Sequence, residues 1–85
     1  MPEYTVKLSK TVQKQLDLLQ GTAFDKIIES IEHLAHNPRP SGYIKLKGRD
    51  GCRIRVGNYR IIYDIYDNVL VIGVLAIGDR KDIYR

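Results

Sequence analysis

Three arginines in the middle of the chain have the side-chain chemistry to bind a phosphodiester. The stretch Cys52–Tyr63 alternates apolar and basic residues around Gly57-Asn58, a pair that suits a two-residue hairpin loop. This register places Arg55 opposite Arg60, and it turns Arg53 toward the same sheet face because opposed side chains share a face. Like charges opposite each other destabilise a hairpin by roughly 0.2–1 kcal/mol. The pattern therefore favours an anion site over a solvated strand face.

Other familiar catalytic patterns are missing from the sequence. We find no paired carboxylates at a useful spacing, no Ser-His-Asp set and no glycine-rich phosphate loop after a strand. The single cysteine, Cys52, excludes an internal disulfide, and His33 and His36 lack the further ligands of a zinc site. We expect neither a metal nor a cofactor. The remaining chemistry is that of guanidinium groups, which offer forked donors to phosphate and stay charged.

Length and charge limit the class of protein. The 85 residues form one domain, 1–85, and the net charge of +4 with a pI near 9.3 favours an acidic partner such as nucleic acid. No stretch is long and apolar enough to span a membrane, and no signal peptide is evident, so we expect a cytoplasmic protein. The basic residues are concentrated in one part of the sequence. Between residues 39 and 60 a single acid, Asp50, accompanies seven basic residues, namely Arg39, Lys45, Lys47, Arg49, Arg53, Arg55 and Arg60.

The first half of the chain reads as one strand and two amphipathic helices. Glu3–Leu8 alternates as a strand does, and Ser9 can cap a helix that runs from Lys10 to a stop at Gly21. Thr22 is expected to cap a second helix, whose apolar residues follow the i, i+3, i+4, i+7 spacing. The segment 37–42 contains two prolines and a glycine and should end the helical half as a loop.

The second half has a period of two and predicts a meander of four strands. These are Tyr43–Lys47, Cys52–Val56, Tyr59–Tyr66 and Val69–Ile77. The predicted fold is α+β in the order β-α-α-β-β-β-β, a mainly antiparallel twisted sheet with both helices on one face. A tight turn at Asp67-Asn68 would place Arg60 opposite Leu75 and Ile62 opposite Gly73. The sheet face that carries the arginines is left uncovered in this arrangement and is a candidate binding surface.

Three motifs together resemble the RelE/ParE toxin superfamily. They are Lys45-Leu46-Lys47-Gly48, the hairpin stretch Cys52–Tyr63, and the final segment Ile-Gly-Asp-Arg-Lys-Asp-Ile-Tyr-Arg at 77–85. The basic hairpin followed by an arginine and a tyrosine is similar to the RelE branch, the ribosome-dependent mRNA endonucleases of type II toxin–antitoxin systems. The resemblance implies metal-independent cleavage of mRNA in the ribosomal A site. The 2′-hydroxyl would attack the adjacent phosphate and leave a 2′,3′-cyclic phosphate and a 5′-hydroxyl.

The same resemblance implies a role for each site residue. Arg53 and Arg55 correspond to a basic pair near the 2′-hydroxyl, Arg60 to the group that stabilises the phosphorane, Arg80 to a contact with the phosphate or leaving oxygen, and Tyr84 to the aromatic residue that orients the nucleotide. Relatives carry lysine at the first two positions. Since arginine effectively cannot lose its proton, we interpret this pair as electrostatic stabilisers and the tyrosine as the proton acceptor. The residues expected to hold the RNA backbone or ribosomal RNA are Lys45, Lys47 and Arg49.

Two other functions stay open. A ParE-like inhibitor of DNA gyrase would share the fold but need not keep the arginines and the tyrosine together. A non-catalytic module would bind only its antitoxin and operator DNA. Arg80 has an alternative role as a salt-bridge donor to Asp64 or Asp82, and Tyr84 as a packing residue. For the leading function we expect a hetero-oligomer with a cognate antitoxin, binding to the ribosome and mRNA, contact with operator DNA only through the antitoxin, and no membrane.

Overall fold

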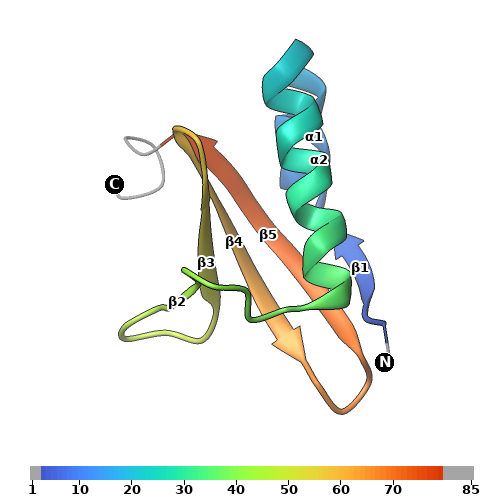
Figure 1. Cartoon of the computed structure of the whole chain (residues 1–85), viewed down its shortest axis with the longest axis vertical. Helices are drawn as coiled ribbons and strands as arrows, with labels where there is room; N and C mark the ends of the chain where they lie inside the picture. Colours follow the sequence, from blue (N-terminus) through green and yellow to red (C-terminus); the bar gives the residue numbers. More distant parts are fainter. Residues whose placement is uncertain (1–2, 80–85) are drawn as a thin grey trace.

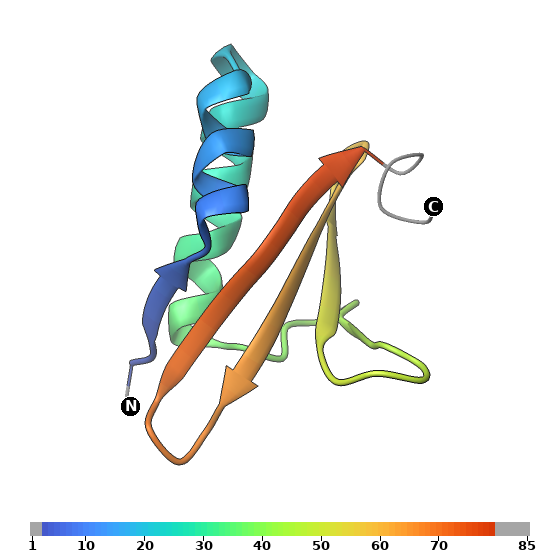
Figure 2. The same cartoon turned by 180° about the vertical axis from the view of Figure 1, so that it is seen from behind.

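The computed structural model describes residues 3–79, which form two helices and one five-stranded sheet (Figures 1 and 2). The sheet order is β1-β5-β4-β3-β2, in which β1 is parallel to β5 and the other pairs are antiparallel. Helix α1 packs on β5, and α2 contacts β1 and β3. The predicted α+β architecture is confirmed. In chain order the elements are β1 (Thr5–Leu8), α1 (Lys10–Leu18), α2 (Gly21–His36), β2 (Ile44–Lys45), β3 (Cys52–Val56), β4 (Tyr59–Tyr66) and β5 (Val71–Asp79).

The two helix starts differ in how they are capped. Ser9 caps α1 as predicted, since its Oγ accepts a hydrogen bond of 3.1 Å from the Val12 amide. The predicted cap at Thr22 is wrong, because α2 already begins at Gly21 and its N-cap, Gln20, makes no side-chain cap bond. Gly21 has φ +61°, a left-handed conformation that glycine adopts at little cost. The glycine thus makes the reversal between the helices, and the threonine falls inside the first turn.

The core lies between the helices and one face of the sheet. It is built from the residues that the helical and strand periods place inward, and Tyr63 is the largest of them. Burial raises the pKa of Tyr63, and its hydroxyl donates a hydrogen bond of 2.7 Å to the Pro38 carbonyl. That bond ties the loop after α2 to the sheet. The other fully buried side chains are Ile27, Leu34, Ile61, Ile72, Ile77, Val12 and Val74.

The β3–β4 hairpin has the predicted bounds and register. Arg55 lies opposite Arg60, Ile54 opposite Ile61 and Arg53 opposite Ile62. The two-residue loop opens with Gly57 at φ +59°, which suits this type of hairpin turn. The prediction is confirmed because local turn chemistry and the period of two were enough to define this pairing.

Strand β2 is shorter than predicted. Only Ile44–Lys45 pairs with β3, whereas the sequence predicted a strand over 43–47. Before it, the Tyr43 amide donates to the Pro40 carbonyl at 3.0 Å, so the chain is still turning when it reaches the sheet. After it, residues 46–51 form a loop with positive φ at Gly48 and Gly51. Turns on both sides therefore cut the strand to two residues.

The predicted β4–β5 register is wrong. The turn occupies residues 67–70, and a bulge lies where Ile62 pairs with Ala76 while Tyr63 pairs with Val74. Arg60 consequently lies opposite Gly78, and Ile62 does not face Gly73. The bulge inserts one residue into β5 and so reverses the side-chain alternation beyond it. The continuous apolar run from 69 to 77 carried no polar alternation that could have fixed this phase.

The arginine face of the sheet is less open than predicted. Arg60 and Ile62 have exposed fractions of only 4% and 7%, respectively. Both lie on β4, which is flanked by β3 on one side and β5 on the other. The prediction of an uncovered face is therefore wrong for these two residues of the central strand, whereas Arg55 on β3 is exposed.

Candidate functional site

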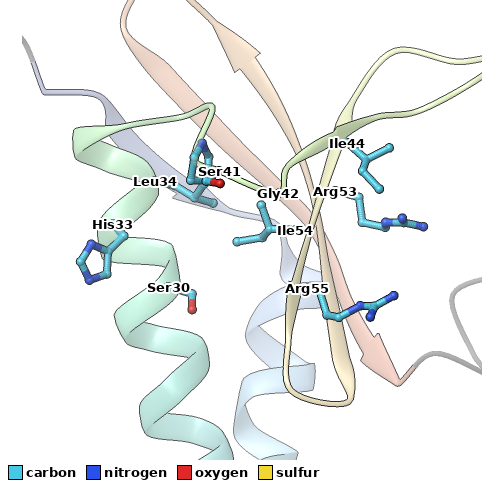
Figure 3. A pocket seen from close by; sticks show the side chains of 10 residues that line it. Ser30, His33, Leu34, Ser41, Gly42, Ile44, Arg53, Ile54 and Arg55 are labelled. Atoms are coloured by element: carbon cyan, nitrogen blue, oxygen red, sulfur yellow. The ribbon is translucent and has the colours of Figure 1, made fainter.

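The arginine face lies on the side of the sheet that points away from the helices. Figure 3 shows the side chains of Arg53 and Arg55 directed away from α2, while Ile54 between them points toward it. The register places Arg60 on the same face as Arg55. Accessibility falls across the three, since Arg55 is exposed, Arg53 half-buried and Arg60 buried. Arg53 and Arg60 each interact with another group of the protein.

The three arginines are carried by adjacent strands, which fixes their backbones relative to one another. Arg55, Arg60 and Gly78 occupy one row across β3, β4 and β5. Two guanidinium groups on neighbouring strands can donate several hydrogen bonds to the oxygens of one phosphate. Gly78 contributes no side chain to this row, so the positive charge is confined to its β3–β4 part.

The three residues expected to hold RNA do not share one face with the arginines. Lys45 pairs with Cys52, whose side chain lies in the core layer, so the lysine belongs to the opposite sheet face from Arg53. Lys47 and Arg49 are exposed in the 46–51 loop. Together these three residues surround the sheet edge. Arg80 and Tyr84 lie outside the described residues.

A groove of about 480 Å³ runs beside β3, between that strand and α2 (Figure 3). Its walls are apolar at Leu34 and Ile54 and polar at Ser30 and His33, and the turn at Pro40–Gly42 closes one end. Arg53 and Arg55 also line it. The sequence did not reveal this groove, because helical spacing assigned His33 only to the side of α2 away from the core. The contact between α2 and β3 brings its walls together.

A second cavity, of about 350 Å³, opens below β2 and β3. It is lined by both cations and carboxylates, including Arg39, Lys45, Asp50 and Asp64, so it has no clear preference for an anion. Cys52 also lines it, but burial raises the pKa of this thiol. A protonated thiol is a poor nucleophile, and the cavity offers no evident catalytic group.

A surface network fixes the loop that borders both cavities. Arg39 donates two hydrogen bonds to Asp67, of 2.8 and 3.3 Å, and the Tyr4 hydroxyl donates a third, of 2.6 Å. These bonds hold the pKa of Asp67 below its usual value, and the nearby carboxylate raises the pKa of Tyr4. The network joins three segments that are distant in sequence, and no local pattern could have predicted it.

The described part of the chain offers no metal site. Within residues 3–79, no three His, Cys, Asp or Glu side chains come together in a way that could hold an ion. In the same range, neither helix is long and apolar enough to cross a bilayer.

Comparison with known proteins identifies the family. Residues 6–84 match the family described as the ParE toxin of type II toxin–antitoxin systems, parDE. The chain belongs to the RelE/ParE toxin superfamily. It is 31% identical over 87 residues to the toxin RelE1 of Methanocaldococcus jannaschii, which covers 98% of this chain and 97% of that one. A RelE-like toxin of Escherichia coli is 29% identical over 88 residues, with coverage of 96% and 90%.

The fold agrees with solved structures of RelE toxins. The toxin chain in the archaeal RelE–RelB complex of Pyrococcus horikoshii OT3 matches with a TM-score of 0.83 and 33% identity, over 96% of this chain and 99% of that chain. The superfamily suggested by the three sequence motifs is thus confirmed. Its members share one arrangement of strands and helices, within which the arginine face of this chain can be interpreted.

Proposed function

We propose that this chain is a toxin that cleaves mRNA on the ribosome, and that a cognate antitoxin inhibits it. One observation carries the proposal: Arg55 and Arg60 lie directly opposite each other on one sheet face, with Arg53 two residues away on the same strand. Fold stability alone disfavours this juxtaposition by roughly 0.2–1 kcal/mol. A phosphate that binds between the guanidinium groups would convert the repulsion into attraction.

The proposed reaction needs no metal, because the nucleophile belongs to the substrate. The phenolate form of Tyr84 accepts the proton of the ribose 2′-hydroxyl, and the 2′-oxygen attacks the adjacent phosphorus. The P–O5′ bond then breaks, which leaves a 2′,3′-cyclic phosphate on one product and, on the other, a 5′-oxygen that Arg80 stabilises and that takes a proton from water. Arg53 and Arg55 stabilise the negative charge that develops on the phosphorane oxygens.

Burial assigns different roles to the arginines in this proposal. Arg55 is exposed and can touch a phosphate as the surface stands. Arg60 has an exposed fraction of 4%, so it can contact a phosphate only if the atoms that cover it move. Its positive charge attracts a phosphate bound at Arg55 without such a movement. We therefore assign first contact with RNA to Arg55, and to Arg60 a contact made as the substrate is positioned.

The ribosome supplies what this small site lacks. Correct orientation of the reacting groups can contribute about 7–11 kcal/mol in the best cases, which reduces the demand on the protein's own groups. In this proposal Lys45, Lys47 and Arg49, exposed around the β2 edge, hold the RNA backbone of the mRNA or of the ribosome. Such contacts provide affinity without sequence preference.

The proposed partner is an antitoxin protein. Relatives with more than a quarter of their residues identical to this chain were solved as RelE–RelB complexes from Pyrococcus horikoshii OT3 and Methanococcus jannaschii. We extend that assembly to this chain as a toxin–antitoxin hetero-oligomer. In this arrangement the antitoxin contacts operator DNA, and the toxin reaches DNA only through it.

A second candidate function is inhibition of DNA gyrase. The observation that favours it is the family description, which names the ParE toxin. The two functions differ in cells: the endonuclease arrests translation and leaves cut mRNA, whereas a gyrase inhibitor causes filamentation and DNA damage. Induction of the chain in bacteria, followed by measurement of both sets of responses, separates them.

The decisive test uses purified components. The chain is mixed with ribosomes programmed with a short mRNA, and the 3′ end of the upstream fragment is characterised. We expect a cut within the A-site codon that leaves a 2′,3′-cyclic phosphate. Intact mRNA under conditions in which the chain binds the ribosome would contradict the proposal.

A further inference from the structure

The second cavity lies where strand β4 runs past the start of β3. The pairing of the two strands begins at Cys52 and Tyr63, whereas β4 continues to Tyr66 (Figure 1). Just before this pairing begins, Gly51 has φ +124° and takes the chain away from the line of β3. The cavity of about 350 Å³ is lined by residues on both sides of this point. It therefore lies at the end of β4 that β3 does not cover.

Main-chain groups of β4 face this cavity. The pair next to the two-residue hairpin loop bonds across β3–β4, and every second pair after it does the same, which includes Cys52 with Tyr63. Ile65 lies two residues further along β4, so it directs its N–H and C=O to the same side. Among residues 3–79 no group bonds to them there. A ligand in the cavity is thus offered one main-chain donor and one acceptor.

The side chains around the cavity add two carboxylates and one ammonium group. Asp64 accepts a hydrogen bond of 3.3 Å from the Tyr66 hydroxyl, and an ionised carboxylate has room for further donors. Lys45 and Asp50 also line the cavity, and within the described range 3–79 their side chains take part in no hydrogen bond or ion pair. These three side chains are therefore available to a ligand.

Tyr66 gives the cavity an exposed aromatic surface. Its exposed fraction is 46%, and its Cε2 lies 3.5 Å from the position that a Cβ on Gly73 would take, so the ring rests on the backbone of β5. The nearby Asp64 carboxylate raises the pKa of the phenol, which keeps the ring uncharged. An exposed ring beside hydrogen-bonding groups suits a ligand that is both planar and polar.

The charges around the cavity disfavour several classes of ligand. The two carboxylates oppose an anion, and Lys45 opposes a metal ion or another cation. Arg39, the other cation of the lining, is held by two hydrogen bonds to Asp67. An apolar ligand would leave the polar groups without partners. A neutral, planar ligand with more donors than acceptors satisfies the cavity best.

We propose that this cavity binds an unstacked guanine base of RNA. The Watson–Crick edge of guanine carries two N–H donors, at N1 and N2, beside one acceptor, O6. Asp64 accepts from both donors, and Lys45 donates to O6. The base lies against the Tyr66 ring, since bases of single-stranded RNA stack on aromatic side chains. RNA as the source of the guanine rests on the proposed function.

This guanine site is separate from the phosphate contacts at the arginines. Arg60 and Asp64 are four residues apart on β4, which is about 13 Å at the rise of a strand, and the alternation of the strand places both on one sheet face. A phosphate at Arg55 and a base in the cavity can therefore belong to neighbouring parts of one RNA strand. Phosphate contacts carry no sequence information, so the cavity supplies a base selectivity that the arginines cannot supply.

Two nucleotides that differ in one group test the site. Guanosine and inosine 5′-monophosphate share the ribose and the phosphate, but inosine lacks the N2 amino group. Each is titrated into the isotope-labelled full chain, and the backbone amides are followed by NMR. We expect the guanine nucleotide to shift the Ile65 and Gly51 amides and to bind there at least about tenfold more tightly, because the carboxylate loses one donor from inosine. The Gln20 amide, between the two helices, is the control and should not shift.

A matched pair of variants assigns the preference to the carboxylate. Asp64→Asn keeps the size of the side chain but removes its charge and one acceptor, whereas Asp17→Asn makes the same change at an exposed position of α1. We expect Asp64→Asn to bind the two nucleotides alike and Asp17→Asn to keep the preference of the wild type. The nucleotide comparison on the wild-type chain stands even if one variant does not fold.

Chemical modification on the ribosome identifies the source of the guanine. Kethoxal reacts with N1 and N2 of unpaired guanines, so a guanine held in the cavity should be protected. Ribosomes carrying an mRNA with 2′-O-methyl groups, which the proposed reaction cannot cleave, are treated with and without the toxin. Protection that the wild type gives and Asp64→Asn does not give supports the proposal and shows whether the base belongs to mRNA or to ribosomal RNA. Identical protection patterns for the two toxins overturn it.

The outcomes separate the two proposals. Equal binding of both nucleotides, or shifts confined to the surroundings of Arg55, overturns the guanine site and leaves the proposed function standing. Shifts of Ile65 and Gly51 with N-acetylarginine amide but not with the guanine nucleotide also overturn it, since the ligand would then be a cationic side chain of a protein. A chain that prefers the guanine nucleotide but leaves mRNA intact on ribosomes overturns the proposed function and leaves the guanine site itself standing.

Discussion

The two edges of the sheet differ in how their backbone groups are satisfied. On the β1 side the chain's own groups bond to the edge at both ends of the strand: the Tyr4 amide donates to the Ala35 carbonyl at 2.8 Å, and beyond the end of β1 the Ile77 amide donates to the Gln15 side chain at 2.7 Å. On the β3 side the ladder stops after two residues of β2, and the groove begins there. The two edges therefore differ in how far the chain itself bonds to them.

The contrast concerns which backbone groups at the sheet edges are bonded by the chain's own side chains. Polar side chains of α1 and of its N-cap replace a missing strand along β5, since Ser9 also donates to the Leu75 carbonyl at 3.2 Å. No described side chain does the same for the end of β3, which instead carries the exposed Arg55. Open edges invite pairing with other chains, and charge restricts which chains can pair.

The largest effect on folding should come from the closed side. Ile72 is fully buried between β1 and β4, so Ile72→Ala should lower the free energy of unfolding by about 2–5 kcal/mol. Ile44→Ala at the open edge, where the side chain is 48% exposed, should change it by less than about 0.5 kcal/mol. Urea unfolding of both variants measures the difference. Equal losses would mean that the two edges contribute alike to the fold.

The largest effect on activity should come from the open side. Arg55→Ala should reduce single-turnover mRNA cleavage on programmed ribosomes by about 10²–10³-fold, the usual range for loss of one group that stabilises transition-state charge. The same change removes the opposition to Arg60, so thermal stability should stay level or rise. Lys14→Ala, which removes an exposed cation from α1, is the matched control and should cleave like the wild type. Full activity of Arg55→Ala would remove this arginine from the site.

A smaller effect should follow from opening the closed edge. Gln15→Leu leaves the Ile77 amide without its acceptor and should cost about 1–3 kcal/mol of unfolding free energy. Gln13→Leu changes an exposed residue of the same helix, whose bond to the Leu8 carbonyl is at the surface, and should have little effect. Faster exchange of the Ile77 amide in Gln15→Leu, but not in Gln13→Leu, would assign the loss to this bond. Unchanged exchange would show that the helix side chain does not close the edge.

The smallest effect concerns the Arg39–Asp67 pair at the end of the sheet. The folded-state pKa of Asp67 is depressed, first by its hydrogen bond from Arg39 and then by that from Tyr4. The ionised Asp67 carboxylate therefore stabilises the folded state at pH values above the pKa of an unfolded aspartate, about 3.9. This stabilisation is lost as the pH falls through the lower folded-state pKa. Thermal melts of wild type and Asp67→Asn should differ slightly near neutral pH and converge in acid. A difference that persists below pH 3 would indicate that the carboxylate charge is not the cause.

The predictions from sequence succeeded where neighbours along the chain decide the structure. The bounds of β3 and β4 and the pairing of Arg55 with Arg60 followed from Gly57-Asn58 and a period of two. The Ser9 cap followed from one side chain and the start of an apolar helix pattern. They failed at Thr22, at the ends of β2 and at β5, where a glycine conformation, two turns and a bulge overrode the local pattern.

The sequence by itself determined the order of the elements and the opposition of two arginines, because each depends on turn chemistry and side-chain alternation over about a dozen residues. Its three motifs also carry the resemblance to the superfamily. Only the tertiary structure decided that Arg60 is buried, that Lys45 lies on the other face and that a groove accompanies the open edge of β3. Those features depend on how α2, β4 and β5 pack against segments distant in sequence. Packing between such segments depends on the volumes of the side chains and on the contacts that they make, and the spacing of residues along the sequence does not predict these contacts.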